Sequence, residues 1–149
     1  VRADEDRRIG CVVVWAGVGT FERFSSDEVR RWRERGEHEI VHGRTGQVFR
    51  LRTDFLDDLA RHRTRYDLQR IVRRFRVPLL AVHGTDDETV PIGEIEELLA
   101  WAPPPTTRFE AVRGTGHTFG AVHPFAGVTP ALERALTVTR TFLAEHLPA

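Results

Sequence analysis

The chain has 149 residues, enough for one ordinary domain with a hydrophobic core but hardly for two. Its 22 acidic residues balance its 22 basic ones, so no overall charge directs it to nucleic acid or to a membrane surface. No apolar run approaches the roughly 20 residues that span a bilayer and no signal peptide opens the chain, so we expect a cytoplasmic protein.

The first predicted element is a strand from Ile9 to Ala16, a continuous apolar run rich in β-branched residues. A run without polar alternation is typical of a strand that is buried on both faces, as in parallel sheets. We therefore expect this strand to lie in a parallel sheet.

The segment from Phe21 to Phe75 interrupts the alternation of strands and helices. It is predicted to contain a helix from the Ser25-x-x-Glu28 capping box to Arg35, a hairpin with strands at 40–41 and 47–51, and helices at 54–62 and 67–75. A crossover between two parallel strands does not require so long an insertion. We therefore expect residues 21–75 to form a lid-like cap or a wall of a substrate pocket.

Two more strands and two helices complete the pattern. Strands are predicted from Val77 to His83 and from Arg108 to Val112, with a helix from Ile92 to Trp101 between them. A final helix begins at the cap residue Thr129 and the first-turn proline Pro130. Strands and helices that alternate at this spacing predict an α/β fold with a parallel sheet of three strands.

Acidic residues and a histidine follow the second and third predicted strands. Asp86 and Asp87 come after the strand that ends at His83, and His117 comes after the strand at 108–112. Because ligands bind beyond the carboxyl ends of parallel strands, we expect these side chains at one edge of the sheet. A carboxylate there can hold the imidazole in one tautomer while the imidazole takes a proton from a nucleophile. His83 itself is expected to be a packed, satisfied histidine that orders the turn.

The nucleophile of such a site is missing from the pattern. The sequence contains no Gly-x-Ser-x-Gly, and its only serines, Ser25 and Ser26, are expected to cap a helix. Asp87 and His117 therefore supply the last two members of a Ser…Asp…His order without the first.

The segment from about Arg76 to Phe125 resembles the C-terminal part of an α/β-hydrolase. It is most similar to the bacterial branch related to dienelactone hydrolases and prolyl-oligopeptidase-type peptidases. In that family the pattern His-Gly-x-x-Asp-x-x-Val-Pro carries the acid of the catalytic triad, which here is Asp87, and Gly-x-Gly-His-Thr-Phe carries the base, which here is His117. Val12 to Phe24 is similar to the strand that follows the nucleophile helix, so the resemblance covers nearly the whole chain.

The resemblance implies a serine hydrolase that cleaves an ester, thioester or peptide-like amide through an acyl-enzyme and needs no cofactor. His117 would act as base and then as acid, and Asp87 would orient it. The family's nucleophile elbow and oxyanion loop would come before Ile9. We therefore expect residues 1–149 to be the C-terminal part of a single hydrolase domain, or a natural truncation of one, and to be nearly inactive alone.

Three aromatic residues of the insertion are candidates for substrate binding: Phe21, Phe24 and Trp32. They are expected to line a pocket for the acyl or leaving group of a small-molecule ester or peptide-like substrate. Core packing explains the same residues at least as well.

Two other interpretations are open at this point. In the first, the chain is a non-catalytic half-domain that pairs the open edge of its sheet with a partner, either the missing half or a second copy in a homodimer. In the second, His83, Asp87, His117 and His123 bind a metal such as zinc. No short ligand pair such as His-x-x-x-His accompanies them, so we expect no metal site.

Overall fold

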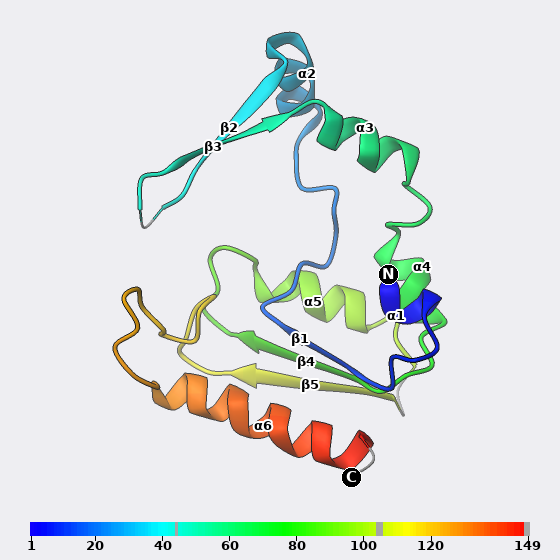
Figure 1. Ribbon diagram of the computed structural model, residues 1–149, viewed down its shortest axis with the longest axis vertical. Helices are drawn as coiled ribbons and strands as arrows, with labels where there is room; N and C mark the ends of the chain where they lie inside the picture. Colours follow the sequence, from blue (N-terminus) through cyan, green and yellow to red (C-terminus); the bar gives the residue numbers. More distant parts are fainter. Residues whose placement is uncertain (44, 104–105, 148–149) are drawn as a thin grey trace. The chain divides into compact units, whose positions relative to one another are not determined.

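The computed structural model describes residues 1–43, 45–103 and 106–147, and these residues fold into two compact units (Figure 1). We call them the sheet unit, which is Val1–Gly19 with Leu68–Ala149, and the small unit, which is Thr20–Asp67. The sheet unit contains Asp87 and His117, and the small unit contains most of the predicted insertion.

Three parallel strands form the sheet of the sheet unit, as the sequence predicts. They are β1 (Val12–Trp15), β4 (Leu79–Gly84) and β5 (Thr107–Val112), and β4 lies between the other two. β1 is shorter than the predicted strand from Ile9 to Ala16, because its pairing with β4 begins only at Leu79, directly after Pro78. Proline has no N–H with which to continue the ladder of hydrogen bonds.

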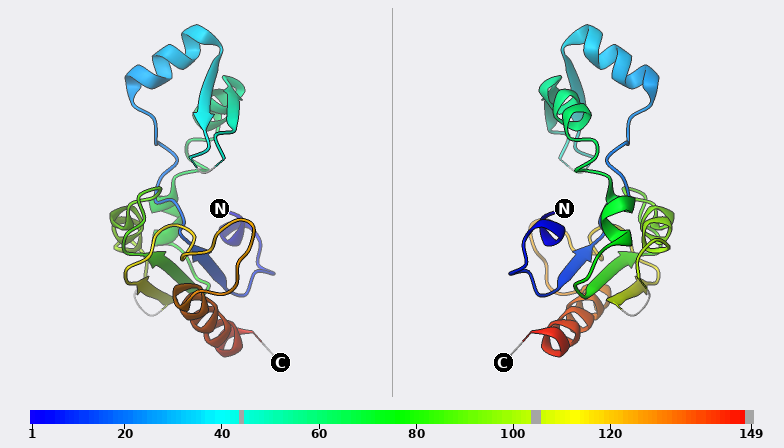
Figure 2. Two further views of the ribbon diagram at one scale, coloured as in Figure 1. Left: turned by 90° about the vertical axis from the view of Figure 1, so that its left-hand side faces the viewer. Right: turned by 90° about the vertical axis from the view of Figure 1, so that its right-hand side faces the viewer.

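Helices cover both faces of this sheet (Figure 2). They are α6 (Pro130–His146) on one face and α1 (Arg2–Glu5), α4 (Leu68–Arg73) and α5 (Ile92–Leu99) on the other. Successive side chains of β4 point to opposite faces, so Leu80 and Val82 pack in the core beneath α6, while Leu79 and Ala81 pack beneath α4 and α5. β4 is buried along its whole length, which explains why its sequence shows no polar alternation.

The final helix starts where the sequence predicts. Thr129 Oγ1 accepts a hydrogen bond from the N–H of Leu132 at 3.1 Å, and Pro130 takes the first helical position. Proline suits that position because an N–H there would have no partner inside the helix. The helix predicted after Pro91 also forms, as α5. None of the helices in the described part of the chain has the length and apolar character needed to cross a membrane.

The small unit consists of α2 (Ser26–Arg35), the antiparallel hairpin of β2 (Glu37–Val41) and β3 (Val48–Arg52), and α3 (Asp54–Arg61). The predicted capping box begins α2: Ser25 Oγ accepts from the N–H of Glu28, and the Glu28 carboxylate accepts from the N–H of Ser25 at 2.8 Å. Gly36 ends the helix with a left-handed φ of 80°, which glycine adopts without strain. Arg44, in the predicted turn of the hairpin, lies outside the described residues.

A cluster of aromatic rings around Trp32 forms the core of the small unit. Trp32 is only 1% exposed, and its ring stacks on His38 at 4.9 Å between ring centroids. The same ring stacks on Phe55 with 5.8 Å between ring centroids, and Phe24 meets it edge-on with 5.2 Å between centroids. These contacts pack the aromatic rings of the small unit against one another.

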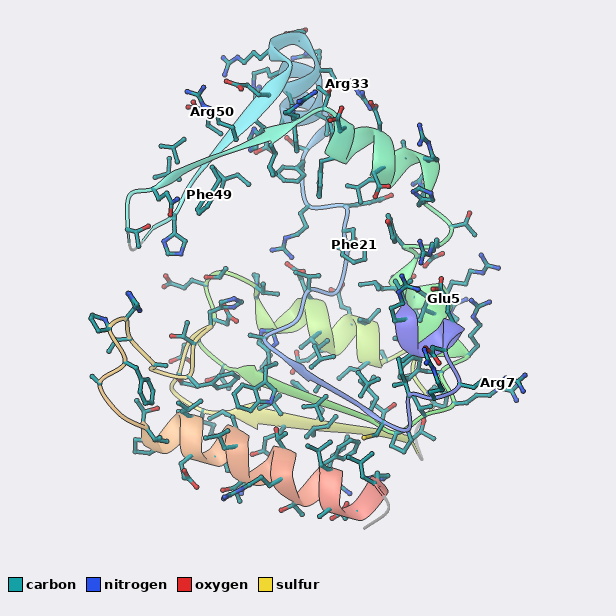
Figure 3. All side chains as sticks on the ribbon, viewed as in Figure 1. Glu5, Arg7, Phe21, Arg33, Phe49 and Arg50 are labelled. Carbon is teal, nitrogen blue, oxygen red and sulfur yellow. The ribbon has the colours of Figure 1, made fainter. Side chains whose placement is uncertain are left out.

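Charged side chains of the small unit, among them Arg33 and Arg50 (Figure 3), form ion pairs with one another. Arg33 Nη1 of α2 donates to Asp57 Oδ1 of α3 at 2.6 Å, and Arg50 Nη2 of β3 lies 3.2 Å from Glu39 Oε1 of β2. All four side chains are about half exposed. Solvent screening therefore limits each pair to a small contribution to stability.

The small unit is shorter at its C-terminal end than the predicted insertion of residues 21–75, because it ends at Asp67. α4 forms close to its predicted position at 67–75 but belongs to the sheet unit. Its Ile71 is buried with Leu79, and its Val72 is buried with Ala81. Helix α4 therefore helps to form the core beneath the sheet.

Candidate active site

The loops that follow β4 and β5 lie side by side at the carboxyl edge of the sheet (Figure 1). Backbone hydrogen bonds join them. The N–H of Thr85 donates to the carbonyl of Val112 at 3.0 Å, and the N–H of Asp86 donates to the carbonyl of Thr115 at 3.0 Å. These bonds fix the loop with the predicted acid against the loop with the predicted base.

Glycine at the end of β4 permits this close approach. A Cβ atom on Gly84 would lie 2.3 Å from the carbonyl oxygen of Thr115 and 2.8 Å from that of Gly116. Atoms at such distances overlap, so any larger residue would push the two loops apart. The glycine of the His-Gly pattern thus keeps the two loops in contact.

The structure brings Asp87 and His117 together. His117 Nδ1 lies 2.9 Å from Asp87 Oδ2. The Asp87 side chain is fully buried, whereas the His117 side chain is 40% exposed. An ionised carboxylate can only accept, so Nδ1 carries the proton of this bond, and in the neutral ring Nε2 presents its lone pair. His117 Nε2 makes no hydrogen bond within the described residues.

Hydrogen bonds keep Asp87 ionised in its buried position. Burial by itself would raise the pKa of this carboxyl, but the N–H of Val90, the ring of His117 and the N–H of Thr89 donate to the carboxylate and hold its pKa below the ordinary value of 3.8. The two backbone bonds go to Oδ1, at 3.0 Å from Val90 and 2.9 Å from Thr89. Asp87 is therefore a carboxylate at neutral pH.

His83 lies against the same carboxylate, and its environment corrects the expectation of a satisfied histidine. Its Nε2 lies 2.8 Å from the carbonyl oxygen of Val90 and 3.3 Å from Asp87 Oδ2. Its other ring nitrogen, Nδ1, is buried and has no hydrogen-bond partner in the described ranges. The signal in the sequence is a histidine that interrupts an apolar strand four residues before Asp87.

A strained residue anchors the loop that carries His117. Phe119 has a left-handed φ of 53°, which is rare for a bulky side chain. Its ring is 2% exposed and meets Trp15 edge-on, with 5.4 Å between centroids. Its carbonyl oxygen accepts a hydrogen bond from Thr129 Oγ1 at the start of α6. The sequence gives no sign of this strain, since it depends on packing between distant segments.

The three aromatic residues predicted for substrate binding lie in the small unit. Trp32 and Phe24 pack together in its core, and Phe21 instead contacts Tyr66, with 5.6 Å between ring centroids. The structure therefore brings together two of the three predicted residues. Trp32 is a core residue, whereas Phe24 packs against it and is partly exposed.

An apolar cavity of about 340 Å³ lies elsewhere in the sheet unit. Its lining includes Val12 and Val14 of β1 and Ile71 of α4, and it includes neither Asp87 nor His117. The cavity is thus separate from the polar pair. Among the residues that the structure describes, no group of three or more His, Cys, Asp or Glu side chains is placed to hold a metal ion.

Comparison with known proteins relies on structure, because neither a family model nor a curated relative matches the sequence. The esterase domain of a Rhodothermus marinus protein is 19% identical with a TM-score of 0.63, over 98% of this chain and 55% of that one. A monoacylglycerol lipase from Paleococcus ferrophilus is 14% identical with a TM-score of 0.61, over 95% and 62%. Est1E from Butyrivibrio proteoclasticus, with ferulic acid bound, is 16% identical with a TM-score of 0.64, over 97% and 53%.

These neighbours match nearly the whole of the chain, including its parallel sheet and flanking helices. The chain has the α/β-hydrolase fold. The fold expected from the resemblance is therefore confirmed, and at these identities the likeness is one of fold. The chain spans about half the length of the solved α/β-hydrolase chains that it matches.

Proposed function

We propose that this chain carries the acid and the base of a serine hydrolase active site, with Asp87 as the acid and His117 as the base. The observation that supports this most strongly is the 2.9 Å contact between His117 Nδ1 and Asp87 Oδ2. The buried carboxylate can hold the ring in the tautomer whose Nε2 accepts a proton, and the ring is exposed enough to meet a nucleophile. Likeness of fold to an esterase domain and a lipase supports the same class of reaction.

The proposed reaction passes through an acyl-enzyme. His117 Nε2 takes the proton of a serine hydroxyl while the serine oxygen forms a bond to the carbonyl carbon of the substrate. The proton then passes from Nε2 to the leaving alcohol, thiol or amine as its bond to that carbon breaks. Water repeats both steps on the acyl-enzyme and releases the carboxylic acid. Asp87 stays ionised throughout, in agreement with its lowered pKa.

The nucleophilic serine and the oxyanion donors are proposed to come from polypeptide outside these 149 residues, in the same longer chain or in a partner. No Gly-x-Ser-x-Gly is present. Ser25 Oγ is bound to Glu28 Oε2 at 2.6 Å within a helix cap, which is unlike the exposed strand-to-helix turn of a nucleophile elbow. The 149 residues alone are therefore expected to be nearly inactive.

The proposed substrate is a small-molecule ester, thioester or peptide-like amide. Among the structural neighbours, one is a monoacylglycerol lipase and another was solved with ferulic acid bound. The small unit is proposed to serve as a cap whose partly exposed rings, Phe21 and Phe24, receive the acyl or leaving group. Trp32, packed beside Phe24, would support that surface.

Labelling with a fluorophosphonate probe tests this proposal. The chain is tagged in the organism that naturally makes it, and the cell extract is exposed to the probe. The tagged chain is then recovered with any polypeptide bound to it. We expect an adduct on a serine outside residues 1–149, and His117→Ala should reduce labelling by about 10³-fold or more. His62→Ala, in the small unit, is the matched control and should label normally. An adduct on Ser25 or Ser26, or labelling that persists in His117→Ala, would contradict the proposal.

A second candidate function, association through the sheet edge, is supported by the environment of β1. Val12 and Ala16 donate their N–H groups to Pro78 and Val82 on the side of β4. The N–H groups of Val13 and Trp15 point to the other side of β1, where no described strand pairs with them. Val14, on this strand, is half-buried and lines the apolar cavity. The occupant that fits this edge is a strand of the nucleophile-bearing part of the same fold.

Sedimentation of the isolated chain tests the second candidate. An open apolar edge predicts self-association well above 17.0 kDa, reduced by Val14→Lys but unchanged by Thr137→Lys on the exposed surface of α6. A monomer of 17.0 kDa at high protein concentration would argue against an open edge.

A further inference from the structure

His83 is a fully buried histidine with only one satisfied ring nitrogen. The side chain is 1% exposed, and Nε2 lies 2.8 Å from the carbonyl oxygen of Val90. A carbonyl oxygen only accepts, so Nε2 carries a proton. A second proton on Nδ1 would be buried without an acceptor within the described residues, which costs desolvation free energy. A ring that carries a proton on Nε2 alone avoids this cost. The ring is therefore the Nε2–H tautomer.

The same nitrogen also lies close to the candidate acid. Nε2 lies 3.3 Å from Asp87 Oδ2, the oxygen that accepts from His117. The hydrogen bond of this N–H goes to the Val90 carbonyl, and the carboxylate oxygen lies beside it. With the backbone N–H groups of Thr89 and Val90 on Oδ1, donors surround the carboxylate on both oxygens.

Val90 connects the two interactions. Its N–H donates to Asp87 Oδ1 at 3.0 Å, and its carbonyl accepts from His83 at 2.8 Å. The turn from Asp87 to Val90 is therefore held from both sides, by the carboxylate and by the His83 ring. A shift of this turn would rotate Oδ2 away from His117.

Packing alone does not explain a histidine at this position. Its strand is otherwise apolar, and the buried Nδ1 lacks a partner in the described ranges, a defect that leucine would not carry. Buried polar groups without partners are rare in folded proteins and call for an explanation. The donor on Nε2 supplies that explanation.

We propose that His83 is a positioning residue, whose Nε2–H holds the turn at residues 87–90 so that Asp87 Oδ2 faces His117. The role of Asp87 as the catalytic acid rests on the proposed function, whereas its positioning by His83 does not. His83 touches neither the substrate nor the nucleophile in this account. It acts through Asp87.

Two substitutions separate the donor from the volume of the ring. His83→Leu keeps an apolar side chain in the strand and removes the donor, and His83→Gln places an amide N–H near the position of Nε2. In His83→Leu we expect the Asp87 carboxyl to titrate at higher pH in a ¹³C NMR titration. The Nδ1–H proton of His117 should also exchange with water about tenfold faster. His83→Gln should restore both readouts towards wild type, and His62→Leu should change neither.

A folded His83→Leu chain with unchanged Asp87 titration and unchanged His117 exchange would overturn the proposal. If His83→Leu does not fold, the wild-type chain decides: ¹⁵N NMR must find the His83 proton on Nε2, and a proton on Nδ1 would overturn the proposal. Probe labelling that persists in His117→Ala would contradict the proposed hydrolase function but would leave these NMR readouts unchanged. The failure of the proposed function and the failure of this proposal are therefore distinguishable.

Discussion

A buried ring nitrogen without a hydrogen-bond partner among the described residues is found in each unit: Trp32 Nε1 in the small unit and His83 Nδ1 in the sheet unit. Their surroundings differ. Trp32 lies among aromatic rings, with His38 and Phe55 stacked on it, so apolar burial offsets its unmade bond. His83 instead turns its other nitrogen towards a carbonyl and a carboxylate. The same defect therefore indicates packing in one unit and electrostatic positioning in the other.

The largest effect on stability is expected in the packed unit. Trp32→Ala should lower the free energy of unfolding of the small unit by about 3–5 kcal/mol, because it removes the central ring of the core. Trp32→Phe keeps an aromatic ring and removes the unpaired N–H, so it should cost less than about 1.5 kcal/mol. Chemical unfolding followed by near-UV circular dichroism checks both values. An equal loss of unfolding free energy in the two variants would show that the core does not depend on an aromatic ring at position 32.

Asp87→Asn should have the next largest effect, and in a pH-dependent way. The loss of charge-assisted hydrogen bonds should cost about 1.5–3 kcal/mol at neutral pH. Because the folded-state pKa of Asp87 lies below its ordinary value, its contribution is complete above 3.8 and is lost as the pH falls through the folded pKa. The stabilities of wild type and Asp87→Asn should therefore converge in acid.

Unfolding curves measured from neutral pH down to acid check this prediction. Asp86→Asn is the matched control, since Asp86 is exposed and, among the described residues, its side chain bonds only the neighbouring Thr85 hydroxyl. A difference between wild type and Asp87→Asn that stays constant with pH would contradict the account.

Gly84→Ala tests the contact between the two loops. The added Cβ would meet the Thr115 carbonyl, so we expect a cost of about 1–3 kcal/mol and a weaker contact between Asp87 and His117. Gly93 of α5 has open space around a Cβ atom, and Gly93→Ala should stabilise by about 0.5–1 kcal/mol. Thermal unfolding of the two variants gives the comparison, and effects of the same sign would refute this explanation of Gly84.

The smallest effect is expected at the surface of the small unit. Arg33→Ala breaks an ion pair between half-exposed side chains and should cost no more than about 1 kcal/mol. A double-mutant cycle with Asp57→Ala, repeated at high salt, measures the pair alone. A coupling energy as large as the effect of Trp32→Ala would mean that the core of this unit has been misplaced.

Local signals in the sequence were sufficient for much of the fold. The capping box at Ser25, the cap at Thr129 and the buried run of β4 are each determined by neighbouring residues, and each forms as predicted. The approach of Asp87 to His117 was also predictable, because both follow parallel strands that end at one edge of a sheet.

Features that depend on distant segments were not predictable. The strain at Phe119 arises from packing against Trp15 and the start of α6. The hydrogen bond between His83 Nε2 and the Val90 carbonyl requires the turn at Val90 to fold back over the end of β4. Membership of α4 in the sheet unit likewise follows from tertiary burial rather than from its helical pattern.

The most direct test of the central claim is a long-range ¹H–¹⁵N correlation spectrum that assigns the tautomer of His117 in the folded chain. The account predicts a proton on Nδ1 of the neutral ring, shifted far downfield by its bond to Asp87 and lost in Asp87→Asn, with Nε2 as the unprotonated nitrogen of that tautomer. A proton on Nε2 with Nδ1 free would mean that Asp87 does not orient His117, and the acid–base pair would not exist.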